Sequence, residues 1–290
     1  MKLGFLFANA GPFADPDLLT HFAVASEAAG VESLWTVEHV FVPVGYKSEY
    51  PYDKSGKMPL GENTPIPDPV LPLAFAAAKT EKIRLATGVM ILPQRHPAYV
   101  AKQMATLDVL SKGRAILGVG VGWLKEEFDA LGVTFETRAE RTREAVTAIR
   151  SLWRGNAEAF EGKFFRWGPV AAYPTPVQPR GVPIVVGGHT DIAAKRAARY
   201  GDGFFPGRGS ETELARLVDV MRADCSKVGR DPSEIEITFP LLAQDMDFVR
   251  RCRSVGVGRL VTGPPGFDRK TLDSGIADLK KRFLDPVAAG

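Results

Sequence analysis

Residues 183–206 have the sequence PIVVGGHTDIAAKRAARYGDGFFP, in which a short apolar run precedes a glycine pair, an amphipathic stretch and a second apolar run. The two apolar runs, 183–186 and 203–206, have the length of buried strands, and 191–200 has the length and spacing of a helix. A helix between two buried strands is typical of parallel strands joined by a crossover connection. The segment therefore predicts one strand–helix–strand unit of an α/β fold.

The same alternation extends over the rest of the chain. It predicts eight strands, at 2–8, 33–37, 83–90, 115–119, 183–186, 203–206, 235–239 and 259–262. Helices are expected at 15–29 including its cap, 68–80, 97–110, 124–131 with 138–153, 191–200, 211–228, 245–255 and 273–283. Eight parallel strands close into a barrel, whereas a doubly wound sheet usually stops at about five to seven strands. We therefore predict one (β/α)8 TIM barrel domain over residues 1–290.

Two irregular segments interrupt this alternation. A loop, 41–67, follows the second strand, and an insertion, 155–181, follows the fourth strand, with a small hairpin expected at 160–164. Loops at one end of a barrel vary while the scaffold stays constant, so both segments are expected to be substrate-specific. The first loop could be a lid over a coenzyme, an ordinary surface loop or a subunit contact. Its candidate lid residues are Tyr46, Lys47, Tyr50 and Tyr52.

Composition is that of a soluble globular protein, with 45% apolar and 24% charged residues. Lysine plus arginine (37) exceed aspartate plus glutamate (34) by only three charges, so we expect a small-molecule substrate and neither nucleic acid nor membrane as a partner. The N-terminal apolar run lacks the features of a secretory signal, and no segment reaches the ~20 apolar residues of a membrane span. We expect a cytoplasmic protein in which Cys225 and Cys252 are reduced.

Candidate site residues are those that follow the strands, because active sites of this fold lie at the C-terminal strand ends. Glu38 and His39 follow the second strand. A histidine there can exchange protons near neutral pH or hydrogen-bond the polar edge of a ring, or it can be a structural residue beside a loop. We take His39 as the candidate catalytic residue and Glu38 as a candidate for the substrate pocket.

The turn Gly187-Gly188-His189-Thr190 lies between a predicted strand and a predicted helix. Two glycines allow close backbone approach, and the free N–H groups of a helix start favour an anion. Thr190 can cap the helix and donate to a phosphate oxygen, while Arg208 after the next strand can supply the counter-charge. A tight turn without a ligand would also need glycine. We favour phosphate binding by Gly187, Gly188, Thr190 and Arg208.

A glycine-rich segment, Gly118-Val-Gly-Val-Gly-Trp123, follows the fourth strand with GxGxG spacing and not the GxGxxG spacing of dinucleotide-binding folds. We interpret Gly120 as making room for a flat ring or a tight turn, and Trp123 as a pocket wall or a core aromatic. The sequence has no HxH or HExxH metal pattern, no lysine at a strand end and no GxSxG elbow. These features favour a planar, phosphorylated cofactor that brings its own reactivity, without a metal.

Six segments carry a family resemblance, and together they span nearly the whole chain. They are SLWTVEH (33–39), TGVMILPQRHP (87–97), AKQMATLD (101–108), SKGRAILGVGVGW (111–123), PIVVGG (183–188) and RYGDG (199–203). The chain thereby resembles the luciferase-like monooxygenase superfamily, in particular its coenzyme F420-dependent oxidoreductase branch. Each segment alone is weak, but the set is specific for the superfamily.

The resemblance implies roles for several residues. His39 resembles the family's histidine near the reactive face of the coenzyme. Thr87-Gly88-Val89 resembles the bulge after the third strand, where F420-dependent members often carry a non-prolyl cis peptide behind the deazaflavin ring. Gly187 and Gly188 resemble the coenzyme phosphate site. Members are often dimers, so the resemblance also implies a homodimer.

One position departs from the family pattern. Sugar-phosphate and alcohol dehydrogenases of this branch carry a glutamate just after the fourth-strand glycines, and here the residue is Trp123. The nearby Glu126 and Glu127 are expected on a helix, pointing at solvent. This departure puts dehydrogenation by the usual acid/base pair in doubt. It favours a more apolar pocket, to which Trp123 and Tyr46 are assigned.

Three functions are open at this point. The first is hydride transfer between coenzyme F420 and an apolar small organic substrate, with His39 orienting the ring or moving a proton. The second keeps the fold but uses reduced FMN and oxygen, as in the monooxygenase branch. The third is a non-catalytic coenzyme-binding protein. The sequence favours the first.

Overall fold

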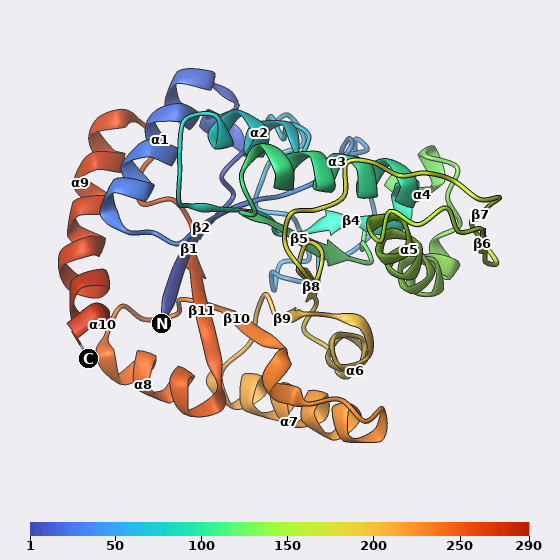
Figure 1. The fold of residues 1–290 in the computed structure, drawn as a ribbon. Coiled ribbons are helices and arrows are strands. Elements are labelled where there is room, and N and C mark those ends of the chain that lie inside the picture. The colour runs from blue at the N-terminus through green and yellow to red at the C-terminus, as the bar shows by residue number, and fades with distance from the viewer. Residues whose placement is uncertain (290) are drawn as a thin grey trace.

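The computed structural model describes residues 1–289, and Gly290, the last residue of the expected domain, lies outside them. It confirms a closed barrel of eight parallel strands surrounded by helices (Figure 1). Around the ring the strands are β1 (Lys2–Leu6), β2 (Ser33–Thr36), β3 (Arg84–Thr87), β5 (Ala115–Gly120), β8 (Ile184–Gly187), β9 (Gly203–Phe205), β10 (Glu236–Pro240) and β11 (Val257–Thr262). β11 pairs with β1, which closes the ring.

The third strand differs from the prediction, because 83–90 is not one continuous strand. β3 ends at Thr87, the Gly88–Val89 peptide bond is cis, and β4 (Met90–Ile91) then continues alongside β5. Thr87 Oγ1 donates to the Gly118 carbonyl at 2.7 Å, and the Gly88 N–H donates to the Thr36 carbonyl at 2.5 Å. The interruption therefore lies between β2 and β5 and is bonded to both.

Ten α-helices occur among the described residues. They are α1 (Pro16–Ala29), α2 (Leu71–Ala77), α3 (Pro97–Leu110), α4 (Lys125–Ala130), α5 (Arg138–Trp153), α6 (Asp191–Tyr200), α7 (Glu211–Lys227), α8 (Met246–Val255), α9 (Arg269–Leu279) and α10 (Asp285–Ala289). α9 begins four residues before its predicted start, because Asp268 and Thr271 cap its first turn reciprocally. α1 and α9 pack side by side, so the first and last long helices complete the outer layer (Figure 1).

Shorter elements occupy the connections. The predicted hairpin is present as β6 (Phe160–Glu161) paired with β7 (Arg166–Trp167), beside α5 at the edge of the molecule in Figure 1. Short helical turns are η1 (Gly11–Ala14), η2 (Leu92–Gln94), η3 (Phe135–Thr137), η4 (Pro232–Glu234) and the π-turn η5 (Lys280–Leu284). The loop 41–67 contains no strand or helix.

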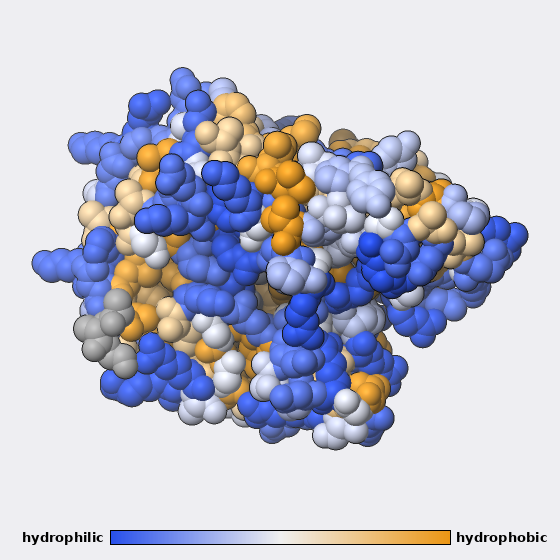
Figure 2. All heavy atoms as spheres, viewed as in Figure 1, coloured by the Kyte–Doolittle hydropathy of each residue, from blue (hydrophilic) through white to orange (hydrophobic). Residues whose placement is uncertain are grey.

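Two apolar clusters hold the barrel together. One fills the barrel interior and contains Trp35, Ile116, Val185 and Phe205, and the other lies between the strands and the surrounding helices. The surface drawn in Figure 2 is mostly hydrophilic, with apolar side chains gathered over α2 and α3. None of the helices in residues 1–289 is both long and apolar enough to cross a membrane.

The N-terminal ends of the strands hold an ionic network around one buried arginine. Arg259 of β11 is fully buried, and its guanidinium contacts Glu32 at 2.7 Å and Glu236 at 2.7 Å. Lys2 also pairs with Glu236, and the Trp35 ring lies 5.5 Å from the guanidinium. The network closes the end of the barrel opposite the candidate site.

Candidate active site

His39 lies directly after β2, at the C-terminal end of the barrel that we call the mouth. Its Nδ1 lies 3.0 Å from Oε2 of Glu127 on α4. The other oxygen of Glu127, Oε1, accepts the Val40 N–H at 2.7 Å and, more weakly, the Phe41 N–H at 3.4 Å. The His39 side chain is 9% exposed and that of Glu127 is 0% exposed. The structure thus joins the candidate catalytic histidine to a buried carboxyl group 88 residues away.

The prediction that Glu126 and Glu127 point at solvent was wrong. Glu127 points inward beside Phe128, and Glu126 binds the loop 41–67. Glu126 Oε1 accepts the Lys47 and Ser48 N–H groups at 2.7 and 3.0 Å, and Oε2 accepts the Ser48 hydroxyl at 2.6 Å. The Ser48 hydroxyl and these N–H groups lower the pKa of Glu126 to about 2. Both glutamates supply acceptors that the loop backbone needs.

One sequence signal pointed to the buried position of Glu127. Leu124, Glu127, Phe128 and Leu131 follow the i, i+3, i+4, i+7 spacing of an apolar helix face. Leu124 and Phe128 are buried on that face. The spacing therefore places Glu127 on the inner side of α4.

Glu38, assigned to the substrate pocket, is buried and already has partners. Its carboxylate accepts the Ile91 N–H at 2.5 Å and Arg95 Nε at 2.6 Å. Arg95 also contacts Asp68 at 3.0 Å. Glu38 therefore connects the residues after β2 to β4 and to Arg95, which lies just before α3.

A cluster of aromatic side chains lies beside His39. Trp123 makes edge contacts with His39, Tyr46 and Tyr50, with ring centroids 5.7, 5.5 and 5.2 Å apart. Tyr50 in turn lies 5.4 Å from Tyr52, and burial raises the pKa of Tyr50 to about 12. The tyrosines of the loop 41–67 thus lie against Trp123 beside His39, which gives this part of the mouth an aromatic lining.

The glycines of the mouth surround the segment Thr87–Val89. A Cβ at Gly118 would lie 1.9 Å from the Thr87 carbonyl oxygen, and one at Gly120 would lie 2.6 Å from the Val89 side chain. A Cβ at Gly187 would lie 2.8 Å from the same side chain. These three positions therefore make room for Val89 and Thr87. The structure brings the predicted Thr87–Val89, Gly120 and Gly187 together in one packing group.

The 187–190 turn has the local geometry that close approach requires. Gly188 has a φ of +131°, and a Cβ there would lie 2.8 Å from Ala193 Cβ. Thr190 caps α6 by accepting the Ala193 N–H at 3.3 Å. Within residues 1–289, the buried Nδ1 of His189 has no hydrogen-bond partner. Burial and the charge of Arg208 lower the pKa of His189.

The loop 41–67 covers this turn. Tyr52 makes an edge contact with His189, with ring centroids 4.9 Å apart, and it also packs near Gly207. Arg208 is exposed and donates to the Pro51 carbonyl. The Pro51 carbonyl therefore accepts from Arg208, the residue that the sequence predicts to bind a phosphate oxygen.

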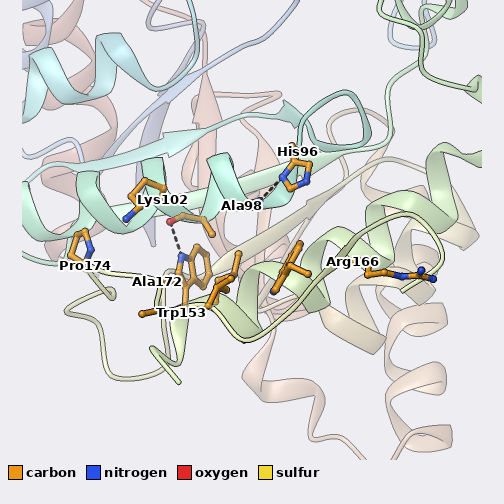
Figure 3. A pocket seen from close by; sticks show the side chains of 12 residues that line it. His96, Ala98, Lys102, Trp153, Arg166, Ala172 and Pro174 are labelled. Carbon is orange, nitrogen blue, oxygen red and sulfur yellow. Dashed lines mark hydrogen bonds between the residues drawn. The ribbon is translucent and has the colours of Figure 1, made fainter. Parts of the chain in front are cut away.

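A cavity of about 340 Å³ lies apart from these residues, between α3, the end of α5 and the 155–181 insertion (Figure 3). Its walls are largely apolar and include Trp153 and Ala172. Lys102 and Arg166 also line it, but Lys102 donates to the Tyr173 carbonyl and Arg166 pairs with Glu161. None of the candidate site residues lines this cavity.

The sequence matches the family model of the luciferase-like monooxygenases over residues 5–244. The chain belongs to this family. An F420-dependent glucose-6-phosphate dehydrogenase of Kineococcus radiotolerans is 35% identical over 247 residues, covering 83% of this chain and 67% of the relative.

Two solved structures share the luciferase-like fold. The monooxygenase RslO1 of Streptomyces bottropensis superposes with a TM-score of 0.76 at 23% identity, covering 99% of this chain and 100% of that one. A coenzyme F420-dependent tetrahydromethanopterin reductase of Methanopyrus kandleri gives 0.75 at 18% identity, with coverages of 98% and 99%. Proteins with this fold thus include a monooxygenase and an F420-dependent reductase.

Proposed function

We propose that this chain binds coenzyme F420 at the barrel mouth and transfers hydride between it and a small, largely apolar organic substrate. The observation that carries the proposal is the buried His39–Glu127 pair beside Trp123, at the strand ends of a luciferase-like barrel. Kinship with an F420-dependent dehydrogenase at 35% identity favours F420 among the family's cofactors.

The residues at the 187–190 turn fit the phosphate end of such a coenzyme. Gly188 permits close backbone approach, and the N-terminus of α6 presents N–H groups favourable to an anion. Arg208 would bind the phosphate in place of the Pro51 carbonyl, and Thr190 would donate its hydroxyl hydrogen while still capping α6. The loop around Tyr52 would shift to admit the group, because it now covers His189.

The reactive ring would lie between Thr87–Val89 and His39. Reduced F420, when bound, supplies the hydride. Thr87, Gly88, Val89 and Gly120 would form the wall behind the ring. The chain's contribution on the other side is His39, whose Nε2 would hydrogen-bond the ring edge or move a proton to or from the substrate.

The substrate would bind against Trp123 and Tyr46. In this position the dehydrogenases of the resemblance have a carboxylate, whereas Trp123 offers an aromatic face and no titratable group. Such a wall favours an apolar, unsaturated or carbonyl-bearing hydride acceptor over a sugar phosphate. Trp123 and Tyr46 would therefore bind the substrate, and His39 would transfer the proton.

Membership of the luciferase-like monooxygenase family supports a second function, that of a flavin-dependent monooxygenase. In that case reduced FMN and oxygen would use the same mouth. Parallel titration of the protein with F420 and with FMN, followed by absorbance and fluorescence, separates the two. Saturable F420 binding with weak FMN binding is expected, and tight FMN binding without F420 binding would overturn the proposal.

Turnover separates an enzyme from a coenzyme-binding protein. Oxidation of reduced F420 would be followed at its absorbance maximum with a panel of enones, aldehydes and nitro compounds. We expect oxidation that depends on protein and on an apolar member of the panel. If the protein binds F420 but neither binds nor turns over any member of the panel, it would be a coenzyme carrier instead.

A further inference from the structure

We infer that Glu127 is the positioning residue that fixes the proton of the His39 imidazole on Nδ1, so that Nε2 is left as the hydrogen-bond acceptor of the site. The assignment of the tautomer rests on the geometry of the contact and on the acceptor chemistry of the Glu127 carboxylate. Its catalytic consequence rests on the proposed function. Neither glutamate of α4 was expected from the sequence to reach the histidine.

The direction of the hydrogen bond follows from the chemistry of its partners. A carboxylate has only acceptor oxygens, and neutral imidazole has one donor and one acceptor nitrogen. The contact between Glu127 Oε2 and Nδ1, at 3.0 Å, therefore requires the hydrogen on Nδ1. The Val40 N–H donates to Oε1 at 2.7 Å, which holds the carboxylate in this orientation.

Nε2 lies on the opposite side of the imidazole ring from Nδ1, away from Glu127. Within residues 1–289 it makes no hydrogen bond, and the imidazole and Trp123 rings meet edge to face with centroids 5.7 Å apart. Rotation of the imidazole by half a turn would place a carbon at Glu127 and break the pair. The imidazole is thus oriented by its hydrogen bond to one buried carboxylate and by its contact with the Trp123 ring.

The neighbouring Glu126 is a matched control. It lies on the same short helix and also accepts N–H groups of the loop, but its partners are Lys47 and Ser48 and not His39. Glu126→Gln and Glu127→Gln make the same chemical change one residue apart. In Glu127→Gln the amide must present its NH2 group either to Nδ1 or to the Val40 N–H, and the first arrangement moves the imidazole hydrogen to Nε2.

The test is long-range ¹H–¹⁵N NMR of the full-length protein labelled at its four histidines, recorded where the imidazoles are neutral. His39→Asn identifies the His39 signals by their loss. We expect the Nδ1–H tautomer in the unmodified protein and in Glu126→Gln. In Glu127→Gln we expect the Nε2–H tautomer or a mixture.

The tautomer of the unmodified protein decides the inference even where Glu127→Gln does not fold. An Nε2–H tautomer there would overturn it, because Glu127 would then be the donor. A predominant Nδ1–H tautomer in a folded Glu127→Met variant, whose side chain offers Nδ1 no oxygen acceptor, would also overturn it. Glu127→Asp, whose shorter carboxylate is still an acceptor, is expected to retain the native tautomer.

Turnover provides the second readout. We expect Glu127→Gln to lower kcat about 10- to 100-fold, by analogy with the removal of carboxylates that orient metal-ligating histidines, with the F420 Kd changed less than about threefold. Glu126→Gln is expected to retain kcat within about twofold, and Glu127→Asp to recover part of it. If F420 does not bind at all, the proposed function fails while the tautomer result stands. If F420 turns over but the tautomer does not depend on Glu127, only the inference fails.

Discussion

At each end of the barrel a side chain with little or no exposure is bound by glutamate, Arg259 at one end and His39 at the other, but the two arrangements differ in the hydrogen-bonding groups that they leave free. At the N-terminal end, Arg259 is held between Glu32 and Glu236, with charged groups on each side. At the mouth, Glu127 uses only one nitrogen of His39, and Nδ1 of His189 has no partner within residues 1–289. The first arrangement satisfies its own groups and stabilises the fold. The second leaves hydrogen-bonding capacity for another molecule.

The largest expected effect is on stability, at the N-terminal end. Arg259→Met leaves Glu32 and Glu236 without their shared cation, and we expect a loss near the lower end of about 3–5 kcal/mol, because both glutamates are partly exposed. Chemical denaturation would measure it. F420 affinity of the folded variant should be unchanged.

Lys2→Met is the control for this change. Lys2 contacts the same Glu236 from the surface, so its removal should cost no more than about 1 kcal/mol. Equal losses for Lys2→Met and Arg259→Met would contradict the view that burial makes the Arg259 network important.

The second prediction is the opposite for the mouth, where a substitution should lower activity and leave stability nearly unchanged. In His39→Asn the amide can still donate to Glu127, so unfolding free energy should change by less than about 1 kcal/mol. Loss of Nε2 should lower kcat/KM for F420-linked turnover at least about 100-fold, or about 2.7 kcal/mol. Steady-state kinetics and denaturation on one preparation check both. Full activity in this variant would remove His39 from the mechanism.

The difference between the two ends also explains how much the sequence could predict. The barrel followed from counting alternating apolar and amphipathic segments, because each unit is local. The His39–Glu127 contact joins positions 88 residues apart. The spacing of Leu124, Glu127 and Phe128 puts Glu127 on an inner face, yet nothing local shows which group it accepts from.

The composition of the third strand alone did not predict its interruption, whereas the family resemblance placed a bulge at Thr87–Val89, where the structure has the cis Gly88–Val89 peptide bond. Arg84 to Met90 has the composition of one buried strand, and the division depends on Gly118 and Gly120 of β5, which leave room for Thr87 and Val89. The start of α9 was readable, because Asp268 and Thr271 stand three residues apart in the pattern of a reciprocal cap. The network around Arg259 was missed, since its other members, Lys2, Glu32 and Glu236, lie at or just before the starts of three different strands.

The third prediction concerns pH at the N-terminal end. Burial alone would raise the pKa of Glu32, but the hydrogen bonds and charge of Arg259 outweigh it and lower this pKa below its ordinary value of 4.5. A lowered folded-state pKa gives stability that is present above about pH 4.5 and is lost as the pH falls through the folded-state pKa. The slope from one group is at most about 1.4 kcal/mol per pH unit.

Arg259→Met removes the cause of that lowered pKa. We therefore expect the stability difference between the unmodified protein and Arg259→Met to be widest above pH 5 and to narrow below about pH 4. Denaturation midpoints measured across this range give the difference directly. A gap that is constant with pH would mean that Glu32 is not the group through which Arg259 stabilises the fold.

The smallest expected effect separates two roles of Thr190, as a helix cap and as a ligand of the coenzyme phosphate. Thr190→Ala removes the cap of α6 and should lower stability by about 1 kcal/mol. Asp245→Ala removes the equivalent cap of α8, where Asp245 accepts the Phe248 N–H at 2.7 Å, and should cost a similar amount. If the 187–190 turn binds the coenzyme phosphate, only Thr190→Ala weakens F420 binding, since only Thr190 would donate to a phosphate oxygen. Equal F420 affinities in the two variants would reduce Thr190 to a helix cap and leave Gly188 and Arg208 to bind the phosphate.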